Sequence, residues 1–349
     1  MRAFRSFSSH HWVILSFAFI TILSYISVKV PPKVCWLASI AGQLIPIFVI
    51  IQTIALIVLV ILKKESFIIP FLILIIGWSF VAKSFSLNAN NLPTITSIRI
   101  LSFNTKLFRK PKTYSEFSTD LIKWVSNDSS DIKCLQEYST NSKWPLLDVT
   151  SQINKKGYSG YIFRAMVTDS DHSPGMAIFS KFDLLDSGIV FQDKNTLNAA
   201  IYVDLNIGGK TTRVYNVHLA SMNIDLNETG GFGNILLLLK RLKYGSIKRI
   251  SQIDTLIKHT KSSPYPYIIC GDFNETPYSY AYQQLSSQFL NAFEEAGNGF
   301  GFTFNEVPYL LRIDHQFYRS DIQAVGYHVN RTIKISDHFP TYGYYLLPK

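Results

Sequence analysis

The sequence has few cysteines for its length, and they form no recognisable framework. Its 349 residues include only Cys35, Cys134 and Cys270. Cys35 lies in a long apolar stretch. Cys134 and Cys270 lie inside short, strand-like apolar runs, where a free thiol behaves as a small hydrophobic side chain. Neither a disulfide pattern nor zinc-ligand spacing is present, so the fold must be stabilised by other means.

Charge is nearly absent from three long stretches near the N-terminus. His11–Val30, Val34–Leu62 and Phe67–Phe85 each contain roughly twenty residues or more, which is enough for a helix to cross a hydrocarbon core. A cleaved signal peptide would not be followed at once by two further apolar stretches. We predict three transmembrane helices, and buried helices of a soluble protein are the alternative.

The chain also lacks tandem repeats and low-complexity tracts, so it is neither a solenoid nor a long disordered segment. We divide it into a membrane domain over residues 1–87, a short polar linker over 88–97, and a single domain over 98–349. That last domain, of about 250 residues, is large enough to bury one core.

The charges outside the apolar stretches are mostly basic, with a formal net charge of +10. Arg2 and Arg5 precede the first stretch, and Lys63 and Lys64 follow the second. Basic residues favour the cytoplasmic side, so the N-terminus is expected inside and residues 98–349 on the extracytoplasmic side. The positive charge favours anionic partners, either lipid head groups or nucleic acid.

Residues 98–349 alternate between patterns of strands and helices, which predicts two packed sheets flanked by helices. We expect strands at Ile98–Phe103, Asp131–Leu135, Gly175–Phe179, Ala199–Leu205, Thr211–Val217 and Tyr267–Cys270, and helices at Tyr114–Ser126 and Ser246–His259.

An insertion over Asn223–Gly245 separates the strand that ends at Val217 from the next helix. It contains the apolar run Ile235–Leu239, followed closely by the basic residues Lys240, Arg241 and Lys243. Such a segment would suit contact with a bilayer surface. An amphipathic helix packed on the sandwich explains it equally well.

Polar residues follow the apolar strands at the points where the strands stop. The clearest case is the stretch Ile268–Tyr278, in which Asp272 and Asn274 point to the same side of an extended chain. The same position is occupied elsewhere by Asn104, Glu137, His218, Asp314, Asp337 and His338. Strand ends gather along one edge of a layered domain, so we expect these side chains to share a cleft. Taken singly, each could be an ordinary turn residue or helix cap.

The residue types in this set suit phosphate chemistry. Glu137 and Asp337, assisted by Asn104, offer the oxygen ligands that Mg²⁺ and Mn²⁺ prefer. His218 and His338 can neutralise phosphate oxygens or transfer protons. Three further roles are available: Asp272 as the base for a water, Asn274 as a hydrogen-bond donor to a developing charge, and Asp314 as the partner of an imidazole.

The chain resembles the endonuclease/exonuclease/phosphatase superfamily, which includes DNase I-like nucleases, neutral sphingomyelinases and inositol-polyphosphate phosphatases. The resemblance covers essentially all of Ile98–Leu347 and none of the apolar N-terminus. It is carried by the runs L-S-F-N (Leu101–Asn104), C-L-Q-E (Cys134–Glu137), G-M-A-I-F-S-K (Gly175–Lys181), N-V-H-L (Asn216–Leu219), G-D-F-N (Gly271–Asn274), R-I-D-H (Arg312–His315) and S-D-H-F-P (Ser336–Pro340).

The resemblance implies a four-layered α/β/β/α sandwich (DNase I-like) preceded by the three transmembrane helices. It also implies roles for the site residues. Asn104 and Glu137 would hold Mg²⁺ or Mn²⁺ with Asp337 nearby, His218 and His338 would contact the scissile phosphate, and Asp314 would pair with His338. Asp272 would orient or deprotonate the attacking water, and Asn274 would stabilise the transition state.

Two departures from the family pattern stand out. Lys106 occupies a position where many relatives carry an acidic residue, which weakens the case for further metal ligation there. His315 stands where tyrosine is common, and we assign it no role. The segment with Asp169, Asp171 and His172 either supplies a partner for His218 or is a surface loop.

The expected activity is metal-dependent hydrolysis of a phosphodiester or phosphomonoester by a membrane-anchored enzyme, with a lipid head group favoured as substrate. A nuclease acting on DNA or RNA is the alternative. A catalytically inactive, membrane-anchored binding or scaffold protein is the alternative of another class.

Overall fold

Two six-stranded mixed sheets form the centre of the molecule. The computed structural model describes residues 9–88, 97–110, 116–165, 174–221, 232–306 and 311–348. The first sheet runs in the order β13 (Gln323–Val329), β14 (Thr341–Leu346), β2 (Ile98–Asn104), β3 (Ile132–Tyr138), β5 (Gly175–Ser180), β4 (Ser159–Arg164). The second runs β10 (Leu290–Asn291), β12 (Asp314–Tyr318), β9 (Tyr267–Asp272), β8 (Lys210–His218), β7 (Ala199–Ile207), β6 (Asp183–Gln192).

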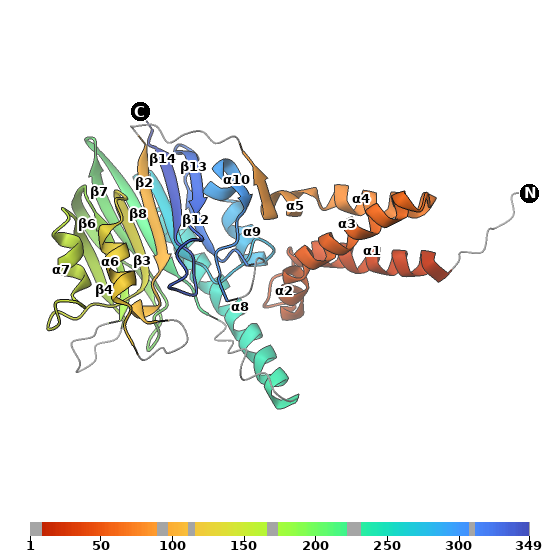
Figure 1. The fold of residues 1–349 in the computed structure, drawn as a ribbon, viewed down its shortest axis with the longest axis horizontal. Coiled ribbons are helices and arrows are strands. Elements are labelled where there is room, and N and C mark those ends of the chain that lie inside the picture. The colour runs from red at the N-terminus through yellow and green to blue at the C-terminus, as the bar shows by residue number, and fades with distance from the viewer. Residues whose placement is uncertain are drawn as a thin grey trace, which may run out of the picture.

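The two sheets pack face to face and helices cover their outer faces (Figure 1). Apolar side chains from both sheets meet between them, including Ile100 and Cys134 from one and Ile201 and Cys270 from the other. The first sheet is covered by α6 (Thr119–Asn127) and α7 (Val149–Asn154), and the second by α8 (Phe232–Lys261) and α9 (Tyr280–Ser286). A further short helix, α10 (Ala292–Ala296), packs against β12 and β13. This arrangement confirms the predicted four-layered sandwich.

Strand direction brings the motif residues to one edge. β2 and β3 are parallel, and so are β8 and β9, so each pair ends on the same side of its sheet. β12 and β14 are antiparallel to their neighbours β9 and β2, and therefore begin where those strands end. The ends of four strands and the starts of two others thus face one region.

Buried carboxamides connect the two sheets across the apolar core. Asn216 of β8 donates through Nδ2 to the carbonyl oxygens of Leu135 and Ala177, both at 3.0 Å. Its Oδ1 accepts a hydrogen bond from Gln136 of β3 at 2.6 Å. Buried amides are costly unless they are paired, so these bonds favour one relative placement of the sheets.

The apolar N-terminus folds into helices that extend away from the sandwich (Figure 1). These are α1 (Ser9–Ser27), α2 (Trp36–Gln43), α3 (Ile45–Ile61), the 3₁₀ turn η1 (Glu65–Phe67), α4 (Ile68–Ile76) and α5 (Trp78–Ser84). Within the described residues, none of these helices alone has the length and apolar composition needed to cross a membrane. Two bent pairs meet the requirement together: Trp36–Gln43 with Ile45–Ile61, bent by 44°, and Glu65–Ile76 with Trp78–Ser84, bent by 64°.

The sequence pattern predicted three continuous helices. The structure instead has one continuous helix and two helices that are each broken into a bent pair. Pro46 lies in the first turn of α3, where it cannot donate a backbone hydrogen bond to a preceding turn. Gly77 separates α4 from α5, and a Cβ there would lie 2.2 Å from the Tyr25 hydroxyl oxygen. Hydropathy reveals neither break because the residues on both sides are mostly apolar.

The helix predicted from Ser246 begins earlier, at Phe232, and includes most of the insertion. Its first half projects beyond the sandwich (Figure 1), and Leu236 and Leu237 are 49% and 44% exposed. These leucines are therefore not the inner face of a packed helix. The helix predicted over Tyr114–Ser126 is α6, and residues 111–115 lie outside the described part of the chain, as do the residues 89–96 of the predicted linker.

Replacing Asn216 with Ala should lower the free energy of unfolding by about 3 kcal/mol, because buried carbonyl groups and the Gln136 amide would lose their partner. Denaturant or thermal unfolding of the purified chain measures the effect. Asn154→Ala, at an exposed position on α7, is the matched control. Equal stability of the two variants would contradict the bridging role of Asn216.

Candidate active site

Asp272 lies at the centre of the predicted cluster. Its backbone pairs with His218 at the end of β8 and with Asp314 at the start of β12, so three functional residues are adjacent across the sheet. Asp272 is 1% exposed. Its Oδ2 accepts a hydrogen bond from Asn104 Nδ2 at 3.0 Å, which joins the second sheet to the end of β2 in the first.

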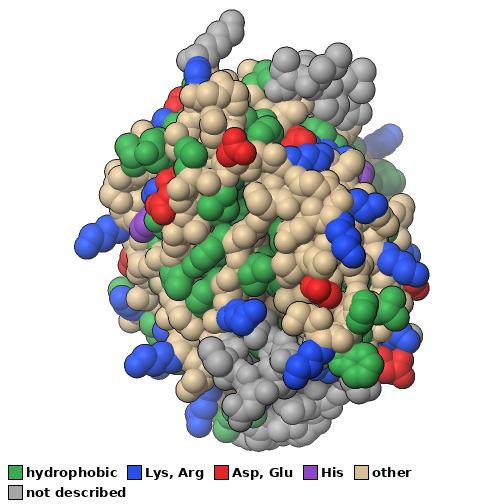
Figure 2. Space-filling model, turned by 90° about the vertical axis from the view of Figure 1, so that its left-hand side faces the viewer, with side chains coloured by type: hydrophobic (Ala, Val, Ile, Leu, Met, Phe, Trp, Pro, Cys, Tyr) green, Lys and Arg blue, Asp and Glu red, His purple; other side chains and the backbone are tan. Residues whose placement is uncertain are grey.

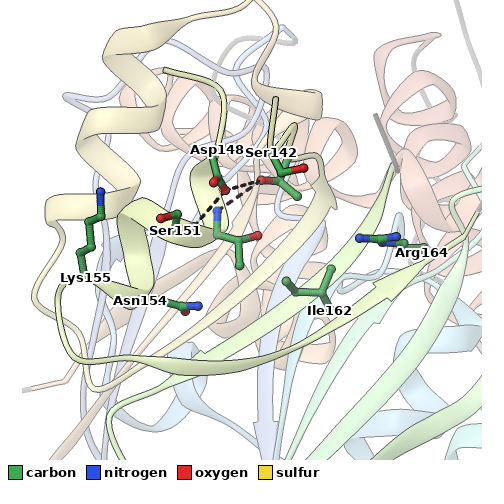
Figure 3. A pocket seen from close by; sticks show the side chains of 9 residues that line it. Ser142, Asp148, Ser151, Asn154, Lys155, Ile162 and Arg164 are labelled. Carbon is green, nitrogen blue, oxygen red and sulfur yellow. Dashed lines mark hydrogen bonds between the residues drawn. The ribbon is translucent and has the colours of Figure 1, made fainter. Parts of the chain in front are cut away.

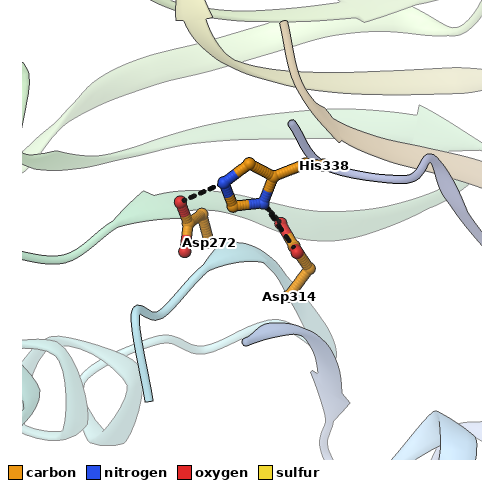
Figure 4. A group of neighbouring side chains, drawn as sticks. All are labelled: Asp272, Asp314 and His338. Atoms are coloured by element: carbon orange, nitrogen blue, oxygen red, sulfur yellow. Dashed lines mark hydrogen bonds and ion pairs between the residues drawn. The ribbon is translucent and has the colours of Figure 1, made fainter. Parts of the chain in front are cut away.

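His338 is held between two carboxylates, as Figure 4 shows. Its Nδ1 lies 2.9 Å from Asp314 Oδ2, and its Nε2 lies 3.6 Å from Asp272 Oδ2. Burial by itself would lower the pKa of His338, but the charges of Asp314, Asp272 and Asp337 outweigh it and hold that pKa well above its ordinary value. The imidazole is thus stabilised as a cation whose Nε2 faces the cleft. Asp314 and His338 are therefore hydrogen-bonded to each other.

His218 approaches Asp272 from the other side. Its Nε2 lies 3.7 Å from Asp272 Oδ2 and 3.9 Å from Glu137 Oε1. Its Nδ1 is 3.2 Å from the carbonyl oxygen of Leu197, which fixes the ring and directs Nε2 toward the carboxylates. Asp169, Asp171 and His172 lie outside the described residues, and the orienting group that the structure supplies is the Leu197 carbonyl. The sequence could not predict this partner, because every residue has a main-chain carbonyl oxygen and no sequence motif marks the one that is used.

Asn274 stands two residues beyond Asp272 in a left-handed conformation, with φ +50°. Its backbone N–H donates to Asp272 Oδ1 at 2.9 Å, and its Nδ2 donates to the Leu219 carbonyl oxygen at 3.0 Å. The amide nitrogen carries a second hydrogen that is available to a substrate. Gly271, before Asp272, is required because a Cβ there would lie 1.9 Å from the Val217 carbonyl oxygen.

Asn104 brings the carboxylates of Glu137 and Asp272 together at the junction of the sheets, while its own Oδ1 accepts a hydrogen bond from the Lys106 backbone N–H at 3.1 Å. Asn104 Nδ2 lies 3.2 Å from Glu137 Oε1 as well as 3.0 Å from Asp272 Oδ2. Such a group fits a hard divalent cation. Ligand atoms of Asp272, Asp314 and His338 also lie within 4.8 Å of one another, although there the imidazole is already hydrogen-bonded to Asp314.

Asp337 lies beside this group but is bonded to Lys106. The Lys106 ammonium is 2.6 Å from Asp337 Oδ2, and the Asp337 side chain is 7% exposed. Burial raises the pKa of Asp337, whereas His338 and Lys106 lower it by a larger amount, so its net pKa lies below the ordinary value. Lys106 had no role in the sequence interpretation, and here it supplies a positive charge at the edge of the cleft.

Backbone strain is present at this site. In the described chain, three of the seven non-glycine residues with positive φ are Lys106, Glu137 and Asn274. Left-handed conformations cost roughly 1–2 kcal/mol per residue for most side chains. Strain of this kind persists where the surrounding structure holds it, and it is typical of functional sites.

A separate pocket of about 550 Å³ opens between α7 and β4 (Figure 3). Lys155 and Arg164 line it together with several hydroxyl groups, and Asp148 there caps α7 by accepting from the Ser151 N–H at 3.0 Å. It contains none of the residues predicted for catalysis. The predicted set lies instead where the strand ends of the two sheets meet.

Residues 101–338 match the Endonuclease/Exonuclease/phosphatase family. The chain belongs to this family. Residues 8–84 match a second family, described as a domain of unknown function. No curated protein is similar enough to match the chain.

Solved structures share the fold at low sequence identity. An endonuclease/exonuclease/phosphatase from Beutenbergia cavernae is 14% identical, with a TM-score of 0.55 and 72% of each chain covered. The human Nocturnin catalytic domain with a bound sulfate anion is 17% identical over 72% of this chain and 93% of its own, with a TM-score of 0.53. D. rerio TDP2, complexed with single-strand DNA product, is 16% identical over 72% of this chain and 99% of its own, with a TM-score of 0.51.

Replacing Glu137 with Gln should weaken the binding of Mg²⁺ or Mn²⁺ by at least about tenfold, because the amide removes a negative charge from the oxygen group. Isothermal titration calorimetry of the metal-free chain measures this. Glu116→Gln is the control, since Glu116 is exposed and paired with Lys110 at 2.7 Å. Unchanged affinity in Glu137→Gln would remove Glu137 from the metal site.

Proposed function

We propose that the chain is a phosphoric ester hydrolase that depends on Mg²⁺ or Mn²⁺ and cleaves a phosphodiester, or a phosphomonoester, by in-line attack of water. The observation that supports this best is the position of Asp272, whose Oδ2 lies within 3.7 Å of Nε2 of both His218 and His338. One base and two imidazoles are thus grouped at the strand ends, where we expect the phosphate to bind.

In this proposal, the carboxylate of Asp272 accepts a proton, and the cationic and amide side chains donate hydrogen bonds to the phosphate. Asp272 takes the proton of the attacking water, while the Asn274 N–H bond to its Oδ1 keeps the carboxylate oriented. His338, stabilised as a cation by Asp314, donates from Nε2 to a phosphate oxygen that gains negative charge. The second amide hydrogen of Asn274 adds a donor from the other side, where His218 Nε2 also lies.

Asn104 and Glu137 would hold the divalent cation, with Asp337 nearby. When bound, the cation would neutralise charge on the phosphate and its leaving oxygen. The convergence of the Glu137 and Asp272 carboxylates on Asn104 supports this assignment, since carboxylate oxygens suit a hard cation. An inactive binding or scaffold protein would have no need to keep this complete set of catalytic side chains together.

We favour a lipid head group as substrate, with the chain anchored in a bilayer and the catalytic domain on the extracytoplasmic side. Large apolar side chains are exposed along the N-terminal helices, among them Phe19 at 62%, Ile54 at 56% and Ile76 at 63%. Leu236 and Leu237 add an exposed apolar patch on the projecting half of α8, next to the exposed Lys240. Helix α2 contacts α8, so the two apolar regions are joined through neighbouring helices.

Nucleic acid is the second candidate, because TDP2 in the comparison above is bound to single-strand DNA product. The net charge of +10 would also favour a polyanion. Lys and Arg side chains on the face turned away from the N-terminal helices are scattered rather than gathered in a track, as Figure 2 shows. This distribution offers nucleic acid no continuous basic path on that face.

Replacing Asp272 with Asn should reduce kcat by about a thousandfold or more, because the amide cannot accept the proton of the attacking water. Hydrolysis of bis(p-nitrophenyl) phosphate with added Mg²⁺ or Mn²⁺ measures the loss, and unfolding temperature checks the fold. Asp254→Asn, exposed on α8, serves as the control. Full activity in Asp272→Asn would eliminate the proposed base.

Replacing Leu236 and Leu237 together with Ser should lower hydrolysis of phospholipid or sphingolipid in vesicles, while leaving hydrolysis of the small soluble diester unchanged. Both side chains are exposed, so their loss removes apolar area that would enter a bilayer surface. Lipid hydrolysis should depend on vesicles or mixed micelles. Cleavage of DNA or RNA that falls steeply with salt and ignores detergent would instead favour the nuclease.

A further inference from the structure

Two loops that carry catalytic residues leave the cleft and dock on the N-terminal helices. One loop runs from Asp272 and Asn274 to Tyr278, and the other precedes Asp314 and contains Arg312. We propose that the N-terminal helices form a positioning element of the active site, and that Tyr278 is the positioning residue through which they hold Asp272 and Asn274. This inference rests on the proposed function, because its activity measurements require the chain to hydrolyse a phosphate ester.

The first loop enters the core of the helical unit. Tyr278 is 4% exposed and belongs to an apolar cluster otherwise formed by the helices, with Tyr25, Ile45 and Phe80 among its members. Its hydroxyl group is hydrogen-bonded to Ser84 at the end of α5. A large aromatic side chain four residues beyond Asn274 is thus buried in a different structural unit from Asn274 itself.

Thr276 makes a second contact from the same loop. Its hydroxyl donates to Gln43 Oε1 at 2.5 Å, at the end of α2. Its neighbour Glu275 is fixed on the sandwich side, because Arg249 of α8 lies 2.5 Å from its carboxylate and His315 Nε2 lies 2.8 Å from its carbonyl oxygen. The sandwich therefore holds the start of the loop and the helices hold its end.

The second loop is joined to the helices through Arg312. This arginine is 4% exposed, and its Nη2 donates to the Lys83 carbonyl oxygen in α5 at 3.0 Å. Its Nη1 donates to Asn291 Oδ1 at 3.0 Å within the sandwich. Arg312 lies two residues before Asp314, so the partner of His338 is also tied to the position of α5.

The chain that leaves α5 strengthens the same junction. β1 (Phe85–Leu87) pairs with β11 (Asn298–Phe300), and the rings of Phe85 and Phe300 pack edge to face at 4.8 Å. Asn88 Nδ2 donates to the Glu294 carbonyl oxygen at 2.9 Å. The helices are therefore attached to the sandwich on both sides of the docked loops and do not swing on a free tether.

Accurate placement matters here because Asp272 and Asn274 act over hydrogen-bond distances. A misplacement of about 1 Å at a reacting group can cost about a hundredfold in rate. Asn274 is in a left-handed conformation and lies outside any strand or helix, so its position depends on what holds the following loop. Tyr278 and Thr276 are the contacts that do so from the helical side.

Gly42 offers a test that leaves every catalytic side chain unchanged. It lies in α2, and a Cβ at this position would lie 2.3 Å from the Tyr278 carbonyl oxygen. Gly42→Ala must therefore move α2 and the loop apart. Alanine favours a helix more than glycine does, so an adverse effect would come from the junction rather than from weakening α2.

The experiment compares full-length wild type, Gly42→Ala, Tyr278→Phe and Ile57→Ala in detergent. Ile57 lies on the same helical unit and is 53% exposed, so it serves as the control. We expect Gly42→Ala to lower kcat for bis(p-nitrophenyl) phosphate about tenfold with KM nearly unchanged. Tyr278→Phe keeps the ring and loses the hydrogen bond to Ser84. Its kcat should lie between the kcat of Gly42→Ala and that of the wild type.

Hydrogen exchange over residues 272–278 gives a second measurement that does not need activity. Exchange in this segment should become faster in Gly42→Ala and stay unchanged in Ile57→Ala. The proposal would be overturned if Gly42→Ala had the same kcat and the same exchange rate as the wild type. It would also be overturned if Ile57→Ala changed kcat and exchange as much as Gly42→Ala does. If the wild type hydrolyses no phosphate ester, the proposed function fails, and exchange alone then decides whether the helices hold the loop.

Discussion

The hydrogen bonds that cross the core between the two sheets are the contacts on which the active site depends. Asn216 and Gln136 form one bridge. Gln316 forms another by donating to Thr341 Oγ1 at 3.1 Å and accepting from the Tyr345 hydroxyl at 2.8 Å. Apolar contacts alone would tolerate sliding, whereas buried amides lose their partners when the sheets shift. The catalytic groups come from both sheets, so this fixed register determines whether they meet.

The bridging residues adjoin the catalytic ones in the sequence. Gln136 immediately precedes Glu137, and Asn216 lies two residues before His218. The bonds that align the sheets therefore act within a few ångströms of the groups that need alignment. Beyond those bonds, three carboxylates stabilise the His338 cation, and left-handed residues turn the chain into the cleft. The same short sequence segments therefore contain both the residues that align the sheets and the predicted catalytic residues.

The N-terminal helices add a constraint that a sandwich alone would lack. They bury Tyr278 and bond to Arg312, whose loops connect directly to Asp272 and Asp314. These helices also expose apolar side chains such as Ile54. In the proposed function, a bilayer would contact the molecule there. Under our proposal of a bilayer anchor, that anchor would be joined directly to the loops that carry Asp272 and Asp314.

The sequence by itself determined the layered fold and the principal cluster, because strand alternation and polar strand ends are local properties of the chain. The resemblance carried by its motifs also implied that Asp314 would pair with His338. Only the tertiary structure showed the breaks at Leu44 and Gly77, since hydropathy averages over them. The Leu197 carbonyl, the Lys106 contact with Asp337 and the docking of Tyr278 on the helices also required it. Each of these joins residues distant in sequence through contacts that no local pattern encodes.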